Sequence, residues 1–149
     1  MSIELLVEGR ATGQIDREGR SWLVSRARMI LRGIDRPRST LSLVLTDDEH
    51  IHALNRTWRH KDRPTDVLSF PQDDPVLLGD VVISLETAWR QRPSHRRLRD
   101  EVVFLLIHGV LHLVGHDHHR LGEARRMRAE EERLWLALGY RSAPYAEPL

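Results

Sequence analysis

The sequence lacks cysteine and contains almost no lysine. With no cysteine among its 149 residues, the chain offers no disulfide, thiolate metal ligand or cysteine nucleophile, so any metal site must use histidine or carboxylate. The absence of cysteine also suits a reducing compartment. Of the 23 basic residues, all except Lys61 are arginine. We attribute this bias to genomic base composition, so the positions of the arginines are more informative than their number.

Long apolar runs and a strong net charge are missing as well. The longest uncharged stretch, residues 102–115, has 14 residues, fewer than the roughly 18 that a membrane span requires, and predicts a buried helix. The formal net charge is +1, so any site for a polyanion must be local. Residues 1–8 contain no basic run followed by an apolar segment, so no secretory signal or transit peptide is expected and we predict a cytoplasmic protein.

The apolar pattern predicts a single domain over residues 1–149 in which strands and helices alternate. The length is typical of one core. Strands are expected at 3–7, 41–45, 67–70 and 79–84, and helices at 16–33, 46–54, 85–92, 94–115 and 121–138. Residues 59–66 are predicted to form a polar loop, and residues 140–149, with two prolines, an irregular tail.

Two of these helices have candidate capping residues. Thr46 and Glu49 are three positions apart, the pattern of a capping box at the start of a helix. Ser94 is the candidate cap of the longest helix, which is expected to stop at Gly115.

Five of the nine histidines lie between positions 108 and 119. On a helix, His108 and His112 project from one face at a separation that suits a single ion. Three neutral imidazoles would leave a fourth position open, as catalytic zinc sites do. The alternative, two core histidines and a solvated turn, is disfavoured because burying unpaired imidazoles costs free energy. We therefore predict one zinc ion per chain, although three histidines also accept nickel, cobalt or iron.

Two histidines compete for the third position. If the helix continued past Gly115, His116 would lie one turn after His112 on the same face. If Gly115 ends the helix in a left-handed conformation, His118 reaches back instead. We favour His118, because glycine inside a helix costs about 1 kcal/mol relative to alanine, whereas glycine just after a helix relieves strain.

The histidine spacing also coincides with the metzincin protease motif. In that motif a glutamate follows the first histidine and serves as the general base. Gly109 occupies this position here. Without a carboxylate at this point, peptide hydrolysis is disfavoured.

A basic segment precedes the longest helix. It contains Arg90, Arg92, His95, Arg96, Arg97 and Arg99. Cations at a helix start oppose the helix dipole, so these residues either contact phosphate or form a solvated turn partly neutralised by Asp100 and Glu101. The nearest aromatic residues are Trp58 and Trp89, which we expect to pack in the core.

Four segments carry recognisable motifs. Residues 108–118 match H-G-x-L-H-L-x-G-[YF]-D-H except at His116, which replaces an aromatic residue. Residues 54–59 match LN-x-x-[YW]-R, residues 64–71 read PTDVLSFP and residues 78–84 read LGDVVIS. Together they resemble the bacterial YbeY family of endoribonucleases and ribosomal RNA maturation factors.

The resemblance implies a small α+β domain with a mixed four-stranded sheet and a central metal-binding helix. It further implies a metal held by His108, His112 and His118, and a catalytic Arg59. The implied activity is endonucleolytic cleavage of single-stranded RNA near the 3′ end of the small-subunit ribosomal RNA. The resemblance also implies a role in ribosome quality control. The implied partners are ribosomal RNA and the small ribosomal subunit with its factors, without DNA or membrane.

Metal-assisted phosphodiester cleavage is consistent with both the histidine pattern and the family resemblance. The ion would lower the pKa of a bound water toward about 7 or coordinate a phosphate oxygen, and Arg59 would stabilise the developing negative charge. Asp66, Asp80 and Asp117 are the candidates for the general base, although Asp117 could instead orient a ligand imidazole. The competing hypothesis is a noncatalytic ribosome-assembly protein whose metal stiffens the fold while arginines contact RNA.

Overall fold

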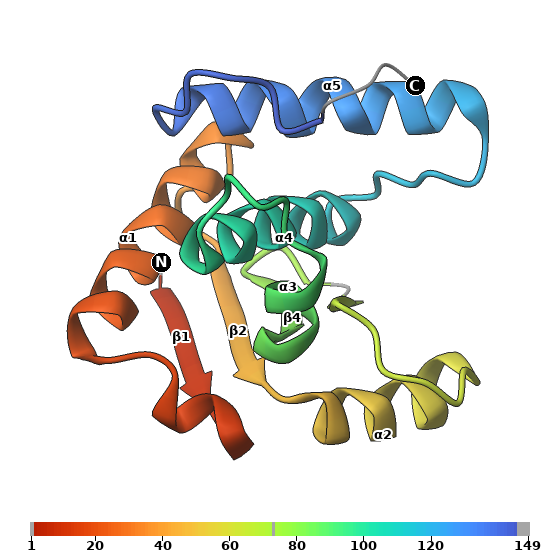
Figure 1. The fold of residues 1–149 in the computed structure, drawn as a ribbon. Coiled ribbons are helices and arrows are strands. Elements are labelled where there is room, and N and C mark those ends of the chain that lie inside the picture. The colour runs from red at the N-terminus through yellow and green to blue at the C-terminus, as the bar shows by residue number, and fades with distance from the viewer. Residues whose placement is uncertain (1, 73, 146–149) are drawn as a thin grey trace.

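The computed structural model describes residues 2–72 and 74–145, arranged as a mixed sheet with helices on both faces (Figure 1). The strands are β1 (Ser2–Val7), β2 (Thr40–Thr46), β3 (Val67–Pro71) and β4 (Leu77–Ser84). The helices are η1 (Gly9–Gly13), α1 (Arg17–Gly33), α2 (Asp48–Arg59), α3 (Leu85–Gln91), α4 (Leu98–Leu113) and α5 (Leu121–Ala137). The strands and long helices lie close to where the periodicity predicts them, whereas the short 3-10 helix η1 was not predicted.

The sheet has the order β1-β2-β4-β3. β1, β2 and β4 are parallel, and β3 pairs antiparallel with β4. Every second residue of β2 (Leu41, Leu43 and Leu45) faces the main core. On the opposite face of the sheet, Val44 and Val82 face the smaller core beneath Ile51 of α2. The expected α+β class with a mixed four-stranded sheet is confirmed.

Helix α4 is buried along most of its length. Apolar side chains occupy nearly all of its faces, so it packs against β3, β4, α1, α3 and α5 (Figure 1). The prediction that Ser94 caps this helix is wrong, because Ser94 lies in a turn closed by the bond from Arg96 N to Pro93 O (2.9 Å). Asp100 and Glu101 in the first turn supply the negative charge that a helix start favours. No helix in the described part of the chain is long and apolar enough to cross a membrane.

Helix α2 differs from its prediction at both ends. Thr46 is the last residue of β2, and Asp47 caps the helix by accepting a hydrogen bond from the backbone N–H of His50 (2.9 Å). The helix continues to Arg59 and ends at His60, which adopts a left-handed conformation. Arg59 therefore lies on the last turn of a helix and not in a loop, because the first proline after it comes at position 64.

Both tryptophans expected in the core are exposed. Trp58 is 64% exposed and Trp89 is 56% exposed. The buried position of α3 next to Trp89 is taken by Ala88, and the guanidinium of Arg92 lies 3.8 Å from the centre of the Trp89 ring. The core prediction was wrong because helical spacing does not show which side of a short amphipathic helix meets the sheet.

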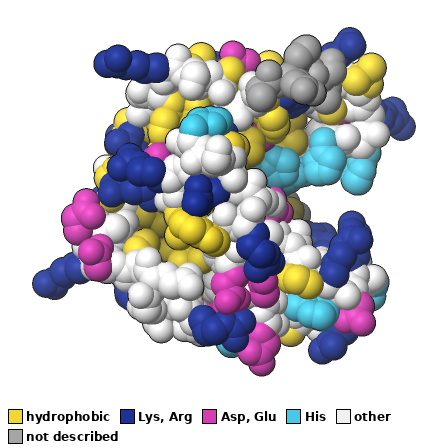
Figure 2. Space-filling view, viewed as in Figure 1, with side chains coloured by type: hydrophobic (Ala, Val, Ile, Leu, Met, Phe, Trp, Pro, Cys, Tyr) yellow, Lys and Arg dark blue, Asp and Glu magenta, His cyan; other side chains and the backbone are white. Residues whose placement is uncertain are grey.

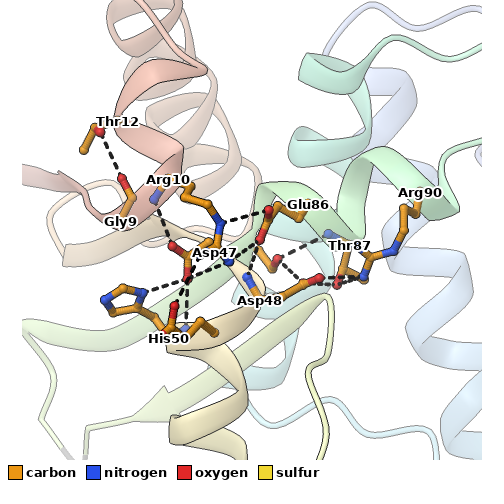
Figure 3. A network of polar contacts seen from close by, with 11 residues as sticks. Gly9, Arg10, Thr12, Asp47, Asp48, His50, Glu86, Thr87 and Arg90 are labelled. Carbon is orange, nitrogen blue, oxygen red and sulfur yellow. Dashed lines mark hydrogen bonds and ion pairs between the residues drawn. The ribbon is translucent and has the colours of Figure 1, made fainter.

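A polar network joins the carboxyl ends of β2 and β4 to η1 and α3 (Figure 3). The buried carboxylate of Asp47 accepts the backbone N–H of Arg10 (2.8 Å), whose side chain pairs with Glu86 (2.9 Å). Asp48 pairs with Arg90 (2.7 Å). Arg90, which belongs to the basic segment, is thus paired with a carboxylate of the protein itself.

The tail is irregular over its described residues 140–145, as predicted, but it is attached to the core. Tyr140 stacks on Trp135 with ring centres 3.7 Å apart, and the indole N–H of Trp135 donates to the carbonyl of Ser142 (2.8 Å). Residues 146–149 of the predicted tail lie outside the described residues.

Candidate functional site

Three histidines converge at the end of α4. Ring nitrogens of His108, His112 and His118 lie within 4.8 Å of one another, a separation at which the three side chains could hold one metal ion. His108 and His112 lie one turn apart on α4, and His118 follows the turn that ends the helix. The helical spacing and the chain reversal thus bring together the set that the sequence predicts.

The chain reversal depends on Gly115. Its φ of 98° lies in the region that glycine adopts without strain. The bonds from Gly115 N to His112 O (3.1 Å) and from His116 N to Leu111 O (3.0 Å) form a Schellman motif that terminates the helix. Among the described residues, the cluster therefore contains His118 and not His116.

Hydrogen bonds orient two of the imidazoles. His108 Nδ1 lies 2.9 Å from a carboxylate oxygen of Glu131, and His112 Nδ1 lies 2.9 Å from the carbonyl oxygen of His116. Because both partners are acceptors, each Nδ1 carries a proton, and each Nε2 is directed away from these partners. The two Nε2 atoms are 3.1 Å apart, within hydrogen-bond distance of each other, so they converge on one point at which a cation would be stabilised.

The electrostatic setting keeps His112 neutral. Burial, followed by the electrostatic influence of the neighbouring His108 and His118, lowers the pKa of His112 below its ordinary value. A neutral imidazole is the form that binds metal.

Glu131 was missed in the sequence analysis. It is 1% exposed and lies on the apolar side of α5, four residues after the buried Met127 and three before the buried Leu134. A lone carboxylate on the buried stripe of a helix was the available signal, because buried charges are rarely unpaired. Glu131 also takes the role considered for Asp117, whose carboxylate instead accepts the backbone N–H of His118 (2.7 Å).

The histidine cluster lines a cleft of about 1020 Å³. Figure 2 shows histidine side chains along one side of this cleft and basic side chains on the other. The basic side is formed by Arg59 at the end of α2 and by Lys61 and Arg63 in the following loop. Such an arrangement places cations opposite the histidine cluster, as binding of a polyanion requires.

Arg59 is held in place by β3. Its guanidinium donates to the carbonyl of Ser69 and lies 5.2 Å from the centre of the Phe70 ring. The hydroxyl of Ser69 donates to the carbonyl of Gly109 (2.8 Å), the residue after His108. Arg59 is therefore connected to the helix that carries the histidines.

Gly109 marks the closest approach of α4 to the sheet. A Cβ at this position would lie 2.7 Å from Cγ1 of Val81 and 3.1 Å from the hydroxyl of Ser69. A side chain here has no room, and it would point at the sheet instead of the cleft. A glutamate at position 109, as in the metzincin proteases, is therefore sterically excluded here.

The candidate general bases differ in location. Asp66 and Asp117 line the cleft, whereas Asp80 is not among the described residues that line it. Asp66 accepts the backbone N–H of Val67 (2.7 Å) and the side chain of Gln91 (3.0 Å). A backbone bond from His118 lowers the pKa of Asp117, so its carboxylate is ionised near neutral pH.

The basic segment before α4 is largely engaged within the protein. Arg96 forms a buried ion pair with Glu101 (2.7 Å). Arg97 pairs with Asp100 (3.2 Å), and Arg99 stacks on Trp22 at 3.8 Å. No arginine of this segment is among the described residues that line the cleft, so internal contacts account for these charges better than a phosphate site does.

A protein family model described as Endoribonuclease YbeY matches residues 12–139. This chain belongs to the YbeY family. The matched range includes Arg59 and the three clustered histidines, so the resemblance drawn from the motifs is confirmed.

Three curated relatives named Endoribonuclease YbeY illustrate the relationship. The chain is 51% identical over 120 residues to the one from Myxococcus xanthus, 46% over 130 residues to the one from Anaeromyxobacter dehalogenans, and 54% over 105 residues to the one from Carboxydothermus hydrogenoformans. These alignments cover 75%, 84% and 66% of this chain. They cover 41%, 67% and 72% of the respective relatives, so the chain spans less than half of the Myxococcus protein.

The fold is also similar to the solution structure of a protein from Thermotoga maritima. The TM-score is 0.63 at 24% identity, with 91% of this chain and 88% of the other covered. This likeness is limited to the arrangement of sheet and helices.

Proposed function

We propose that this chain is a metal-dependent endoribonuclease that cleaves single-stranded RNA in the cytoplasm. The observation that carries the proposal is the convergence of three imidazoles on one side of a cleft whose other side is basic. The names of the relatives support the same activity. The proposed substrate is ribosomal RNA near the 3′ end of the small-subunit RNA, with the small subunit and its factors as partners in ribosome maturation and quality control.

His108, His112 and His118 would hold one ion, with zinc as the expected metal. Their fit is supported by the two Nε2 atoms that face each other at 3.1 Å while both Nδ1 atoms are engaged elsewhere. When bound, such an ion supplies Lewis acidity next to the scissile phosphodiester.

Arg59 is the proposed catalytic residue. Its bond to the carbonyl of Ser69 fixes one edge of the guanidinium and leaves further N–H groups for a phosphate. Donors held in place before the reaction stabilise negative charge that develops on the phosphate oxygens. Lys61 and Arg63 continue the basic side and would position the strand on either side of the cleavage point.

Trp58 gives a physical reason to prefer single-stranded RNA. It is 64% exposed and precedes Arg59 on the last turn of α2. An exposed indole stacks on unpaired bases, which duplex RNA does not present. We therefore expect unpaired bases of the substrate to stack on Trp58, the residue before Arg59 of the cleft.

The test compares cleavage of one labelled sequence, presented as a single strand and as a duplex, by the full chain reconstituted with zinc. We expect endonucleolytic products from the single strand, and their loss in His108→Ala that retains the circular dichroism spectrum of the wild type. Binding of RNA without turnover by the zinc-loaded chain would instead support the noncatalytic assembly factor. Casein serves as a negative control, because no peptidase activity is expected.

A further inference from the structure

A buried carboxylate connects the C-terminal tail to the histidine cluster. One oxygen of Glu131 lies 2.9 Å from His108 Nδ1, and its other oxygen accepts a hydrogen bond from the hydroxyl of Tyr145 (2.8 Å). Glu131 is 1% exposed, so water cannot easily replace either partner. The orientation of the carboxylate is therefore set from two sides, by α4 and by the tail.

The tail is anchored to the rest of the protein at Pro144 and Tyr145. Arg96, which is 9% exposed and paired with Glu101, donates to the carbonyl of Pro144 (2.7 Å). The Tyr145 ring packs edge-on against Phe104, with ring centres 5.4 Å apart, and the guanidinium of Arg128 lies 3.7 Å from the ring centre. These contacts place the hydroxyl with little freedom to leave Glu131.

The hydroxyl remains a donor over the physiological pH range. Burial, followed by the charge of Glu131, raises the pKa of Tyr145 above its ordinary value. A buried carboxylate with one oxygen unpaired would rotate toward another donor, and this rotation weakens its bond to His108. The ring of His108 would then lose the partner that aims its Nε2 at His112.

We infer that Tyr145 is a positioning residue of the metal site, whose hydroxyl holds Glu131 against His108 and so strengthens binding of the metal ion. The inference rests on the proposed metal site. Tyr145 lies beyond residue 139, where the match to the YbeY family ends, so the family match does not itself assign this contact.

The experiment measures zinc affinity of the full chain by competition with a chromophoric chelator at pH 7.5. Tyr145→Phe removes one hydroxyl and keeps the ring that packs on Phe104. We expect its Kd for zinc to rise about tenfold, and that of Glu131→Gln to rise by about 10- to 100-fold. The visible spectrum of the cobalt-loaded chain should change in both variants, because the geometry of the ligands is altered.

Tyr140→Phe is the matched control. Tyr140 lies in the same tail, is half-buried, and donates its hydroxyl to a carboxylate, that of Asp100 (2.7 Å). We expect it to lower the unfolding midpoint of the metal-free protein about as much as Tyr145→Phe while leaving the zinc Kd unchanged. An unchanged Kd in Tyr145→Phe, or an equal loss in both variants, would overturn the inference. A wild-type chain that binds neither zinc nor cobalt would instead overturn the proposed metal site, and the inference with it.

Discussion

The guanidinium of Arg59 donates a hydrogen bond to the backbone carbonyl of Ser69. This bond fixes the orientation of the side chain at the mouth of the cleft, and a planar group with several N–H donors is needed to keep it while also binding a phosphate. A lysine at the same position would carry the charge but would lack the planar group with several N–H donors.

We therefore expect Arg59→Lys to lose RNA cleavage almost as fully as Arg59→Ala, each by at least about 100-fold in rate. The zinc content of both variants should equal that of the wild type, because Arg59 makes no contact with the histidines. Initial cleavage rates and metal analysis of the same preparations check this. Wild-type rates in the lysine variant would mean that charge alone is required, or that Arg59 is not catalytic.

The third ligand is tested by comparing His116→Tyr with His118→Ala. His116 contributes its backbone carbonyl to His112, which any residue can supply, whereas the ring nitrogen of His118 belongs to the cluster. We expect His116→Tyr to keep its metal and most activity, and His118→Ala to lose both. The reverse pattern, measured by metal content and cleavage rate, would overturn the ligand assignment.

Metal binding should depend on pH in a defined direction. Imidazoles must be neutral to bind, so zinc affinity should weaken as pH falls through the ordinary histidine range near about 6.5. Burial lowers the pKa of His112, so in the metal-free protein this ligand should take up a proton only below its ordinary pKa. Zinc titrations between pH 5 and 8, with a stoichiometry near one per chain at the upper end, test the expectation; a stoichiometry near zero would exclude the site.

Gly109→Ala should destabilise the protein by about 1–3 kcal/mol, because a methyl group would lie 2.7 Å from Val81. Gly122→Ala is the control. Gly122 also lies in a helix, and the nearest neighbour of a Cβ added there would be the Arg126 side chain at 3.7 Å. This substitution should be neutral or slightly stabilising. Urea unfolding of the two metal-free variants gives the comparison, and equal effects would show that α4 can move away from the sheet at little cost.

Asp47→Ala should cost more stability than Asp16→Ala. Both residues cap helices, but Asp16 is exposed, whereas the buried Asp47 also accepts the N–H of Arg10. We expect losses of about 1 kcal/mol for Asp16→Ala and about 2–4 kcal/mol for Asp47→Ala at pH 7, measured by urea unfolding.

The Asp47 effect should also depend on pH. Burial alone would raise the pKa of Asp47, but hydrogen bonds from Arg10 and His50 outweigh burial and hold the pKa well below its ordinary value of 3.8. A carboxylate of this kind stabilises the fold above its unfolded pKa, and the contribution is lost as pH falls toward the folded pKa. The difference between wild type and Asp47→Ala should therefore shrink below about pH 3.8; a constant difference would mean that the charge is not involved.

Most of the fold and the histidine set could be predicted from the sequence. Alternating apolar residues located the strands, and the spacing of His108 and His112 with Gly115 defined the end of α4. These features depend on residues close together in the chain, where helix and turn geometry leave few alternatives. Family motifs, and not periodicity, suggested the sheet type and the role of Arg59.

The rest was decided by tertiary structure. Glu131 reaches His108 across 23 positions, and Tyr145 reaches Glu131 across 14. Arg96, expected in a phosphate site or a solvated turn, is buried against Glu101 and the tail. Local patterns do not encode such contacts, because they exist only once α5 and the tail pack against α4, and a buried charge is stable only with the partners that this packing supplies.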